Sequence, residues 1–154
     1  MKILVFSDSH GELRYMEKAV FDESPDIIIH LGDKIRDSEK LQEKFCRIPF
    51  ISVPGNCDMG SILQPIRIEE ISGVRFFITH GHIHAVKMGM LRYRLAAEEA
   101  GVQVALYGHT HVAAYEKAGD IHMMNPGAAG GGYPSYGVVE IDTCGGISCR
   151  IVKL

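Results

Sequence analysis

The feature that most constrains the fold is a regular alternation of apolar runs and amphipathic segments in the first third of the chain. The runs are short and rich in β-branched residues, as in buried strands, whereas the segments between them space their apolar residues at helical intervals. We expect strands at residues 2–6, 26–31 and 49–53 and helices at residues 12–23 and 38–47. Because each helix must cross back over the sheet, this β-α-β-α-β series predicts parallel strands.

The second half of the chain changes to shorter, antiparallel units. We expect strands at residues 65–71 and 74–80, joined by a hairpin turn, and a helix at 86–100 that ends at Gly101. A strand at 102–108 and four short strands beyond residue 112 follow. Parallel units followed by antiparallel ones predict an α/β protein in which two mixed sheets form a sandwich with helices outside. At 154 residues, the chain is most simply a single domain over 1–154.

Charge and the first residues limit the partners and the compartment. The net charge of −3 gives no global positive field to hold a phosphate backbone, so we expect no long nucleic-acid partner. Only four consecutive apolar residues precede Ser7, whereas a secretory signal has about 7–15 and a membrane span about 20. We therefore expect a cytoplasmic protein with no membrane segment. Its cysteines are then free thiols by default, with a Cys144–Cys149 disulfide as the alternative.

Side chains that can bind metals follow the predicted strands, each at a strand end. Because ligands bind at the carboxyl ends of strands in open α/β sheets, we expect these side chains to meet at one edge. They are Asp8, His10, Asp33, Asn56, His80, His109 and His111. Turn and cap chemistry is the alternative explanation for any one of them taken alone.

This set is too large for one metal ion. A tetrahedral zinc site takes four ligands, or three and a water, whereas seven ligands fit two ions bridged by a carboxylate at about 3.5–4 Å. Nitrogen and oxygen donors suit manganese, iron or zinc and reject an iron–sulfur cluster. The sequence therefore predicts a dinuclear centre.

The order of these motifs resembles the calcineurin-like metallophosphoesterase superfamily. D-x-H, G-D, G-N-x-D, G-H and G-H-x-H occur in that order, followed by N-P-G at 125–127. The small size and the G-N-C-D variant are similar to the small prokaryotic phosphodiesterase branch, which shares its fold with the retromer subunit Vps29. The resemblance implies a four-layer α/β/β/α sandwich of two mixed sheets, the metallo-dependent phosphatase fold. It also implies that Asp8, His10, Asp33 and His111 hold a first ion and that Asp33, Asn56, His80 and His109 hold a second.

The resemblance further implies a metal-dependent phosphodiesterase that hydrolyses small phosphate diesters by attack of a metal-bridging hydroxide. Two divalent ions and the two carboxylates Asp8 and Asp33 leave a charge of about +2, which suits a hydroxide and a phosphodiester monoanion. We expect Mn²⁺, with Fe, Zn or Ni as alternatives, and a substrate that could be of the nucleotide type.

Cys57 makes the general acid an open question. Many relatives place a histidine at this position, which protonates the leaving group and is oriented by the acidic residue that follows, here Asp58. A thiol with an ordinary pKa near 8.5 suits that role poorly. We favour His82 as the catalytic acid, with Cys57 as the other candidate.

Two other functions remain open from the sequence. One is a non-catalytic Vps29-like binding scaffold, against which the intact ligand set argues. The other is a metal-dependent phosphomonoesterase, which would profit from a pair of arginines over the site that the motif loops do not clearly supply. His30 and His122 are better explained as structural histidines than as ligands, and a homo-oligomer is left open.

Overall fold

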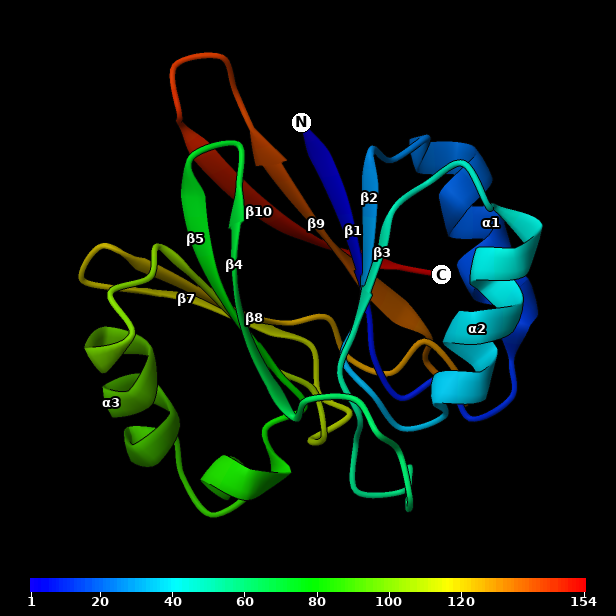
Figure 1. Cartoon of the computed structure of the whole chain (residues 1–154), viewed down its shortest axis with the longest axis horizontal. Coiled ribbons are helices and arrows are strands. Elements are labelled where there is room, and N and C mark those ends of the chain that lie inside the picture. The colour runs from blue at the N-terminus through cyan, green and yellow to red at the C-terminus, as the bar shows by residue number, and fades with distance from the viewer.

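The computed structural model describes residues 1–154, and its elements follow the expected alternation (Figure 1). The helices are α1 (Leu13–Glu23), α2 (Ile35–Lys44) and α3 (Leu91–Glu99), with a short 3-10 helix η1 (His82–His84). The strands are β1 (Lys2–Phe6), β2 (Ile27–His30), β3 (Phe50–Ser52), β4 (Ile66–Ile71), β5 (Val74–Thr79), β6 (Val104–Leu106), β7 (Ala114–Ala118), β8 (Ile121–Asn125), β9 (Ser135–Ile141) and β10 (Ile147–Lys153).

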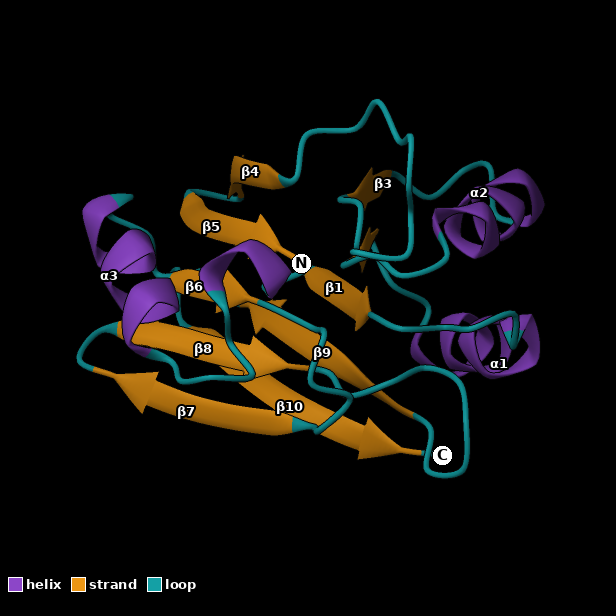
Figure 2. Ribbon diagram, turned by 90° about the horizontal axis from the view of Figure 1, so that it is seen from below, coloured by secondary structure: helices purple, strands orange, loops and turns teal.

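The strands form two five-stranded sheets that face each other. The first sheet has the order β10-β9-β1-β2-β3 and the second the order β4-β5-β6-β8-β7. As predicted, β1, β2 and β3 run parallel, whereas β9 and β10 extend that sheet with antiparallel pairs. Helices α1 and α2 lie outside the first sheet and α3 lies outside the second (Figures 1 and 2). The predicted four-layer sandwich of two mixed sheets is therefore confirmed.

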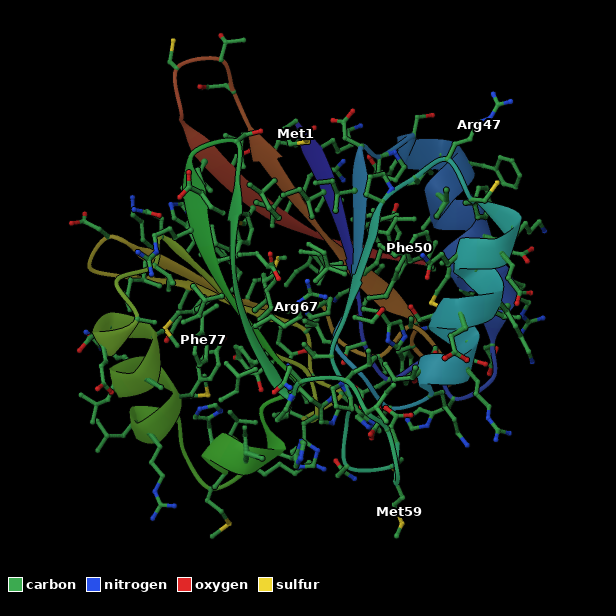
Figure 3. All side chains as sticks on the ribbon, viewed as in Figure 1. Met1, Arg47, Phe50, Met59, Arg67 and Phe77 are labelled. Atoms are coloured by element: carbon green, nitrogen blue, oxygen red, sulfur yellow. The ribbon has the colours of Figure 1, made fainter.

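Three apolar clusters fill the spaces between the four layers. Strands β1 and β2 are buried on both faces. Ile3 and Ile29 point between the sheets, whereas Leu4 and Ile28 pack beneath α1 and α2. This double burial explains why these strands read as continuous apolar runs. The third cluster joins α3 to the second sheet around Phe77, which lies on the α3 side of that sheet (Figure 3).

Three predicted helix boundaries were wrong, one of them the end of α2, which lies at Lys44 instead of residue 47. Helix α2 begins at Ile35, three residues before the predicted start, because a side chain from a distant loop caps it, as described below. Helix α3 begins only at Leu91 instead of residue 86. The chain between η1 and α3 contains the left-handed residues Ala85 and Gly89, with φ of 53° and 150°, and this backbone is incompatible with a helix.

The cysteines and two histidines behave as the sequence suggested. All four cysteines are free thiols, so the alternative Cys144–Cys149 disulfide is absent. His30 is buried in β2 and its Nδ1 accepts the amide N–H of Gly32, and His122 Nδ1 lies 3.0 Å from the hydroxyl of Tyr115. No helix combines the length and the apolar character that crossing a bilayer requires.

Candidate metal centre

The loops that follow β1, β2, β3, β5 and β6 meet at one edge of the sandwich, the lower edge in Figure 1. Five of the seven predicted ligands form two overlapping groups whose donor atoms all lie within 4.8 Å of one another. Asn56 and His109 flank these groups, because Asn56 Oδ1 lies 3.2 Å from His80 Nε2 and the ring of His109 lies 5.1 Å from that of His80. The structure therefore brings the whole predicted set together.

The first group consists of Asp8, His10 and His111. Asp8 is fully buried, and its Oδ2 accepts hydrogen bonds from the Ser7 hydroxyl and from the amide of His109. Its Oδ1 lies 3.0 Å from His111 Nε2, but the ring is not aligned to donate, so this buried oxygen has no hydrogen-bond partner. A buried carboxylate oxygen without a donor is costly, and a cation held with the imidazoles would satisfy it.

The second group consists of Asp8, Asp33 and His80. His80 Nδ1 lies 2.8 Å from the carbonyl oxygen of Leu31, and a carbonyl can only accept, so Nδ1 carries the proton. In the neutral ring, Nε2 then presents a lone pair to two further acceptors, Asn56 Oδ1 at 3.2 Å and Asp33 Oδ2 at 3.6 Å. Three lone pairs that converge without a proton between them fit a metal ion, and the Leu31 carbonyl fixes the ring orientation as in known metal-bound histidines.

Asp8 belongs to both groups, whereas Asp33 belongs only to the second. Asp33 Oδ1 accepts the amide N–H of Cys57 at 2.8 Å, which leaves Oδ2 free. Burial alone would raise the pKa of the Asp33 carboxyl, but this amide and the nearby His80 ring outweigh burial, so the pKa is lowered. Asp33 is thus held as an anion, the form in which a carboxylate binds a metal ion.

The backbone that carries these side chains is strained. Five of the seven predicted ligands have φ between 49° and 67°, a region that residues other than glycine rarely adopt. They are Asp8, His10, Asp33, His109 and His111. Such conformations cost about 1–3 kcal/mol each and cluster at functional sites, so turn chemistry alone does not explain the set.

Two glycines let the loops approach one another at the centre. A Cβ on Gly55 would lie 2.1 Å from Asp33 Oδ1, and a Cβ on Gly108 would lie 1.9 Å from the Ser7 hydroxyl oxygen. Neither contact can exist between real atoms, so both positions require glycine. The G-N and G-H-x-H motifs therefore combine a predicted ligand with the glycine that makes room for it.

Several supporting side chains hold the ligand loops from behind. Asn125 Nδ2 donates to the Gly108 carbonyl and to the Thr110 hydroxyl, so the N-P-G motif supports the loop that carries His109 and His111. Asp37, a buried residue of α2, accepts hydrogen bonds from the Ser9 hydroxyl and the Gly11 amide and so fixes the loop that carries His10. Asp37 could not be found from the sequence, because nothing in a helical pattern marks an acidic residue as facing inward.

Asp58 has a different role from the predicted one. Its two carboxylate oxygens accept four backbone N–H groups, at 2.8–2.9 Å, from Asp33, Lys34, Ile35 and Gly55. Asp58 therefore caps the start of α2 and ties the second and third ligand loops together, and it does not orient Cys57.

Cys57 is exposed and lies beside Asp33. A hydrogen bond to the Asp33 carboxylate, with a further contribution from burial, raises the pKa of its thiol. The thiol therefore keeps its proton at neutral pH, which makes Cys57 a poor nucleophile.

The two histidines that follow His80 point to different places. The ring centroid of His82 lies 5.4 Å from that of His80 and 6.2 Å from that of His109, so His82 borders the second group. His84 instead packs edge-on against Phe77 and Tyr93 in the apolar layer under α3. Burial, and next the neighbouring His80, lower the pKa of His82; burial, and next Lys87, lower that of His109.

Fold and site together define a metal-binding α/β/β/α sandwich with a nitrogen and oxygen ligand set at one strand edge. The model of the calcineurin-like phosphoesterase superfamily domain matches residues 1–144. The chain belongs to this superfamily, in which curated relatives are named metallophosphoesterase or phosphodiesterase.

Comparisons with individual proteins support the same superfamily. The chain is 34% identical to the probable metallophosphoesterase YsnB of Bacillus subtilis, over 83% of this chain and 75% of that protein. It is 30% identical to the phosphodiesterase MJ0936 of Methanocaldococcus jannaschii, over 92% and 94% of the two chains. The crystal structure of Entamoeba histolytica Vps29 complexed with Zn²⁺ has a TM-score of 0.78 at 17% identity and covers 99% of each chain, which is a likeness of fold.

Proposed function

We propose that this protein is a phosphodiesterase that uses two divalent metal ions to hydrolyse small phosphate diesters. The observation that carries the proposal is the convergence of unpaired acceptors on two overlapping groups, above all the buried Asp8 oxygen and the lone pair of His80. Family membership supports the phosphoester class, and the relatives named phosphodiesterase support the diester.

Each ion would have its own set of residues. Asp8, His10, Asp33 and His111 would hold the first ion and Asp33, Asn56, His80 and His109 the second, with Asp33 shared. The donor chemistry suits Mn²⁺, with Fe, Zn and Ni as alternatives. When bound, the two ions would supply an activated water and neutralise the phosphoryl oxygens during in-line displacement.

His82 is our candidate for assisting the leaving group. Its ring borders His80 and His109, and its Nδ1 is buried without a hydrogen-bond partner. A neutral imidazole still donates one N–H, which would stabilise the departing alkoxide or phenolate oxygen. Cys57, whose thiol keeps its proton beside Asp33, is the second candidate donor.

The substrate is expected to be small and could be of the nucleotide type. The ligand loops are short and no large segment is inserted between them, so we propose that residues 1–154 work as one domain with an open site. With a net charge of −3, the protein offers no general attraction to a long nucleic acid.

A binding scaffold is the second candidate, because the Vps29 structure shares this fold over nearly the whole chain. A scaffold has no need of the strained ligand backbone and the unpaired Asp8 oxygen, which favours the enzyme.

The test compares bis(p-nitrophenyl) phosphate with p-nitrophenyl phosphate, each with added Mn²⁺ and with EDTA. We expect turnover of the diester that chelation abolishes and Mn²⁺ restores. Preference for the monoester would instead identify a phosphomonoesterase. Absence of turnover with every divalent metal tried, together with no bound metal, would favour the function of a binding scaffold.

A further inference from the structure

A groove lies beside the metal centre, between the amino-terminal end of α2 and the loop that joins β3 to β4. The loop and the helix run next to each other in Figure 2, and Met59 marks the outer tip of the loop in Figure 3. The groove has a volume of about 560 Å³, within the range of small-molecule sites. Cys57 connects it to the centre, because Cys57 lines the groove and its amide N–H binds Asp33.

The helix side of the groove carries two cationic side chains at its amino-terminal end. Lys34 and Arg36 line it, both are exposed, and neither forms an ion pair with an acidic side chain. The lining also holds two carboxylates, Asp58 and Glu39. Asp58 keeps its charge but turns both oxygens to four backbone N–H groups, whose partial positive charges partly offset it, whereas Glu39 has no such donors. The Lys34 amide is one of those four, so its backbone is fixed at the mouth of the groove. Two free cations on a fixed backbone suit a phosphate group.

The opposite side of the groove is apolar. Met59 and Ile62 are 93% and 96% exposed, and Leu63 next to them is 37% exposed. A cluster of apolar side chains as exposed as these is stabilised when an apolar or planar group covers it and removes their surface from water. A ligand that fits both sides therefore combines a flat or apolar body with an anion.

We infer that this groove binds the non-reacting part of the substrate, and that this part is a nucleoside carrying a second phosphate. The inference rests on the proposed function for the position of the reacting phosphate, which would lie at the metal centre on the inner side of Cys57. The nucleoside would lie against Met59 and Ile62, and its second phosphate against Lys34 and Arg36. The substrate class is then a nucleotide diester with an additional terminal phosphate.

Two substrates that share a leaving group test this inference. One is the p-nitrophenyl ester of thymidine 5′-phosphate, and the other is the same ester with an added 3′-phosphate. We expect the Mn²⁺-loaded wild-type protein to show a KM about tenfold lower for the second substrate, as two modest charge pairs would give. The double variant Lys34→Gln/Arg36→Gln should lose this preference, and Lys34→Arg/Arg36→Lys should keep it.

The matched control removes two positive charges elsewhere. Lys40 and Arg47 are exposed and lie outside the groove, and Arg47 is at the far end of the molecule from Met59 (Figure 3). Lys40→Gln/Arg47→Gln should keep the preference and the activity on bis(p-nitrophenyl) phosphate. Equal KM values for the two esters in the wild type, or a preference that survives Lys34→Gln/Arg36→Gln, would overturn the inference.

A binding measurement separates this inference from the proposed function. Calorimetry should show that thymidine 3′,5′-bisphosphate binds the wild-type protein about tenfold more tightly than thymidine 5′-phosphate, and that Lys34→Gln/Arg36→Gln removes the difference. If bis(p-nitrophenyl) phosphate is not hydrolysed but this difference in affinity is present, the proposed hydrolase activity is wrong and the assignment of the groove is supported. If hydrolysis occurs but the two nucleotides bind with equal affinity, the groove assignment is wrong and the proposed hydrolase activity is supported.

Discussion

At the scale of single residues, the proposed centre depends most directly on two buried carboxylates. Asp8 Oδ1 has no hydrogen-bond partner and Asp33 Oδ2 faces His80, so each offers an oxygen to a cation. The family resemblance gives the bridging position to Asp33, whereas the grouping of donor atoms places Asp8 within reach of both ligand groups. Substitution of each carboxylate by its amide separates the two possibilities.

Asp33→Asn should cost both metal ions and nearly all turnover. The change removes the charge that the two ions would share but keeps the size of the side chain. We therefore expect metal content to fall from about two ions per chain towards zero. We also expect kcat/KM on bis(p-nitrophenyl) phosphate to fall at least about 100-fold. Elemental analysis together with the assay measures both. Asp22→Asn, an exposed control, should retain metal and rate. Normal metal content and rate in Asp33→Asn would show that Asp33 is not the bridge, and loss of both ions in Asp8→Asn alone would give that position to Asp8.

Cys57→Ala should have a mild effect on an activated aryl ester. The raised pKa of the thiol keeps it uncharged, and p-nitrophenolate leaves without a strong acid, so we expect a change in kcat of less than about fivefold. His82→Gln should lower kcat more on a diester with an alkoxide leaving group than on the aryl diester. A collapse of aryl-ester turnover in Cys57→Ala would make the thiol chemically essential and remove His82 as the favoured donor.

The seven predicted ligands could be found from the sequence because each follows an apolar strand, and parallel strands deliver their ends to one edge. The residues that support them could not. Asp37 accepts the amide of Gly11, 26 positions away, and Asp58 accepts amides of the second ligand loop, 23 to 25 positions away. Such hydrogen bonds have no local sequence pattern. Which of the histidines after His80 faces the centre was likewise decided only by the turn at Gly81–Ala85.

At the scale of elements, the junction between β2 and α2 depends on a side chain from another loop. Asp58 accepts N–H groups from Asp33, Lys34 and Ile35 at the start of α2 and from Gly55 in its own loop. The carboxylate satisfies donors that a helix start leaves unpaired, and its negative charge complements the positive end of the helix dipole. This long-range cap explains why α2 starts earlier than its own residues predicted.

Asp58→Ala should therefore destabilise the protein and loosen the metal centre together. Four backbone donors lose a charged acceptor, so we expect the free energy of unfolding to fall by about 2–4 kcal/mol. Because Asp33 and Gly55 lie on the two loops that Asp58 joins, Mn²⁺ affinity should fall as well. Urea unfolding of metal-free protein and Mn²⁺ titration measure the two effects. Cys57→Ala provides the neighbouring control, and unchanged stability in Asp58→Ala would contradict the capping role.

At the scale of the whole molecule, the four-layer arrangement follows from the burial of both faces of the central strands. Continuous apolar runs such as Ile3–Phe6 need cover on two sides, which the second sheet and the helices α1 and α2 supply. The sequence predicted this architecture, because the alternation of strands and helices leaves few other ways to bury them. The order of strands in the second sheet, in which β8 lies between β6 and β7, was beyond the sequence, since short strands carry no mark of their partners.

Burial in this architecture also predicts how the stability of the protein depends on pH. His30 is fully buried in β2, and this burial lowers its pKa to about 4, against about 6.5 in the unfolded chain. Between these values the unfolded chain binds the additional proton, so stability must fall as pH falls from about 6.5 towards 4. Metal-free wild-type protein should lose about 2 kcal/mol more than His30→Gln between pH 7.5 and pH 5.0. Urea unfolding in EDTA at the two pH values measures this difference, with the metal ligands equally free in both proteins. Identical pH dependence in the two proteins would mean that His30 gains a proton in the folded state as readily as in the unfolded one. The interpretation of His30 as a buried neutral imidazole would then be wrong.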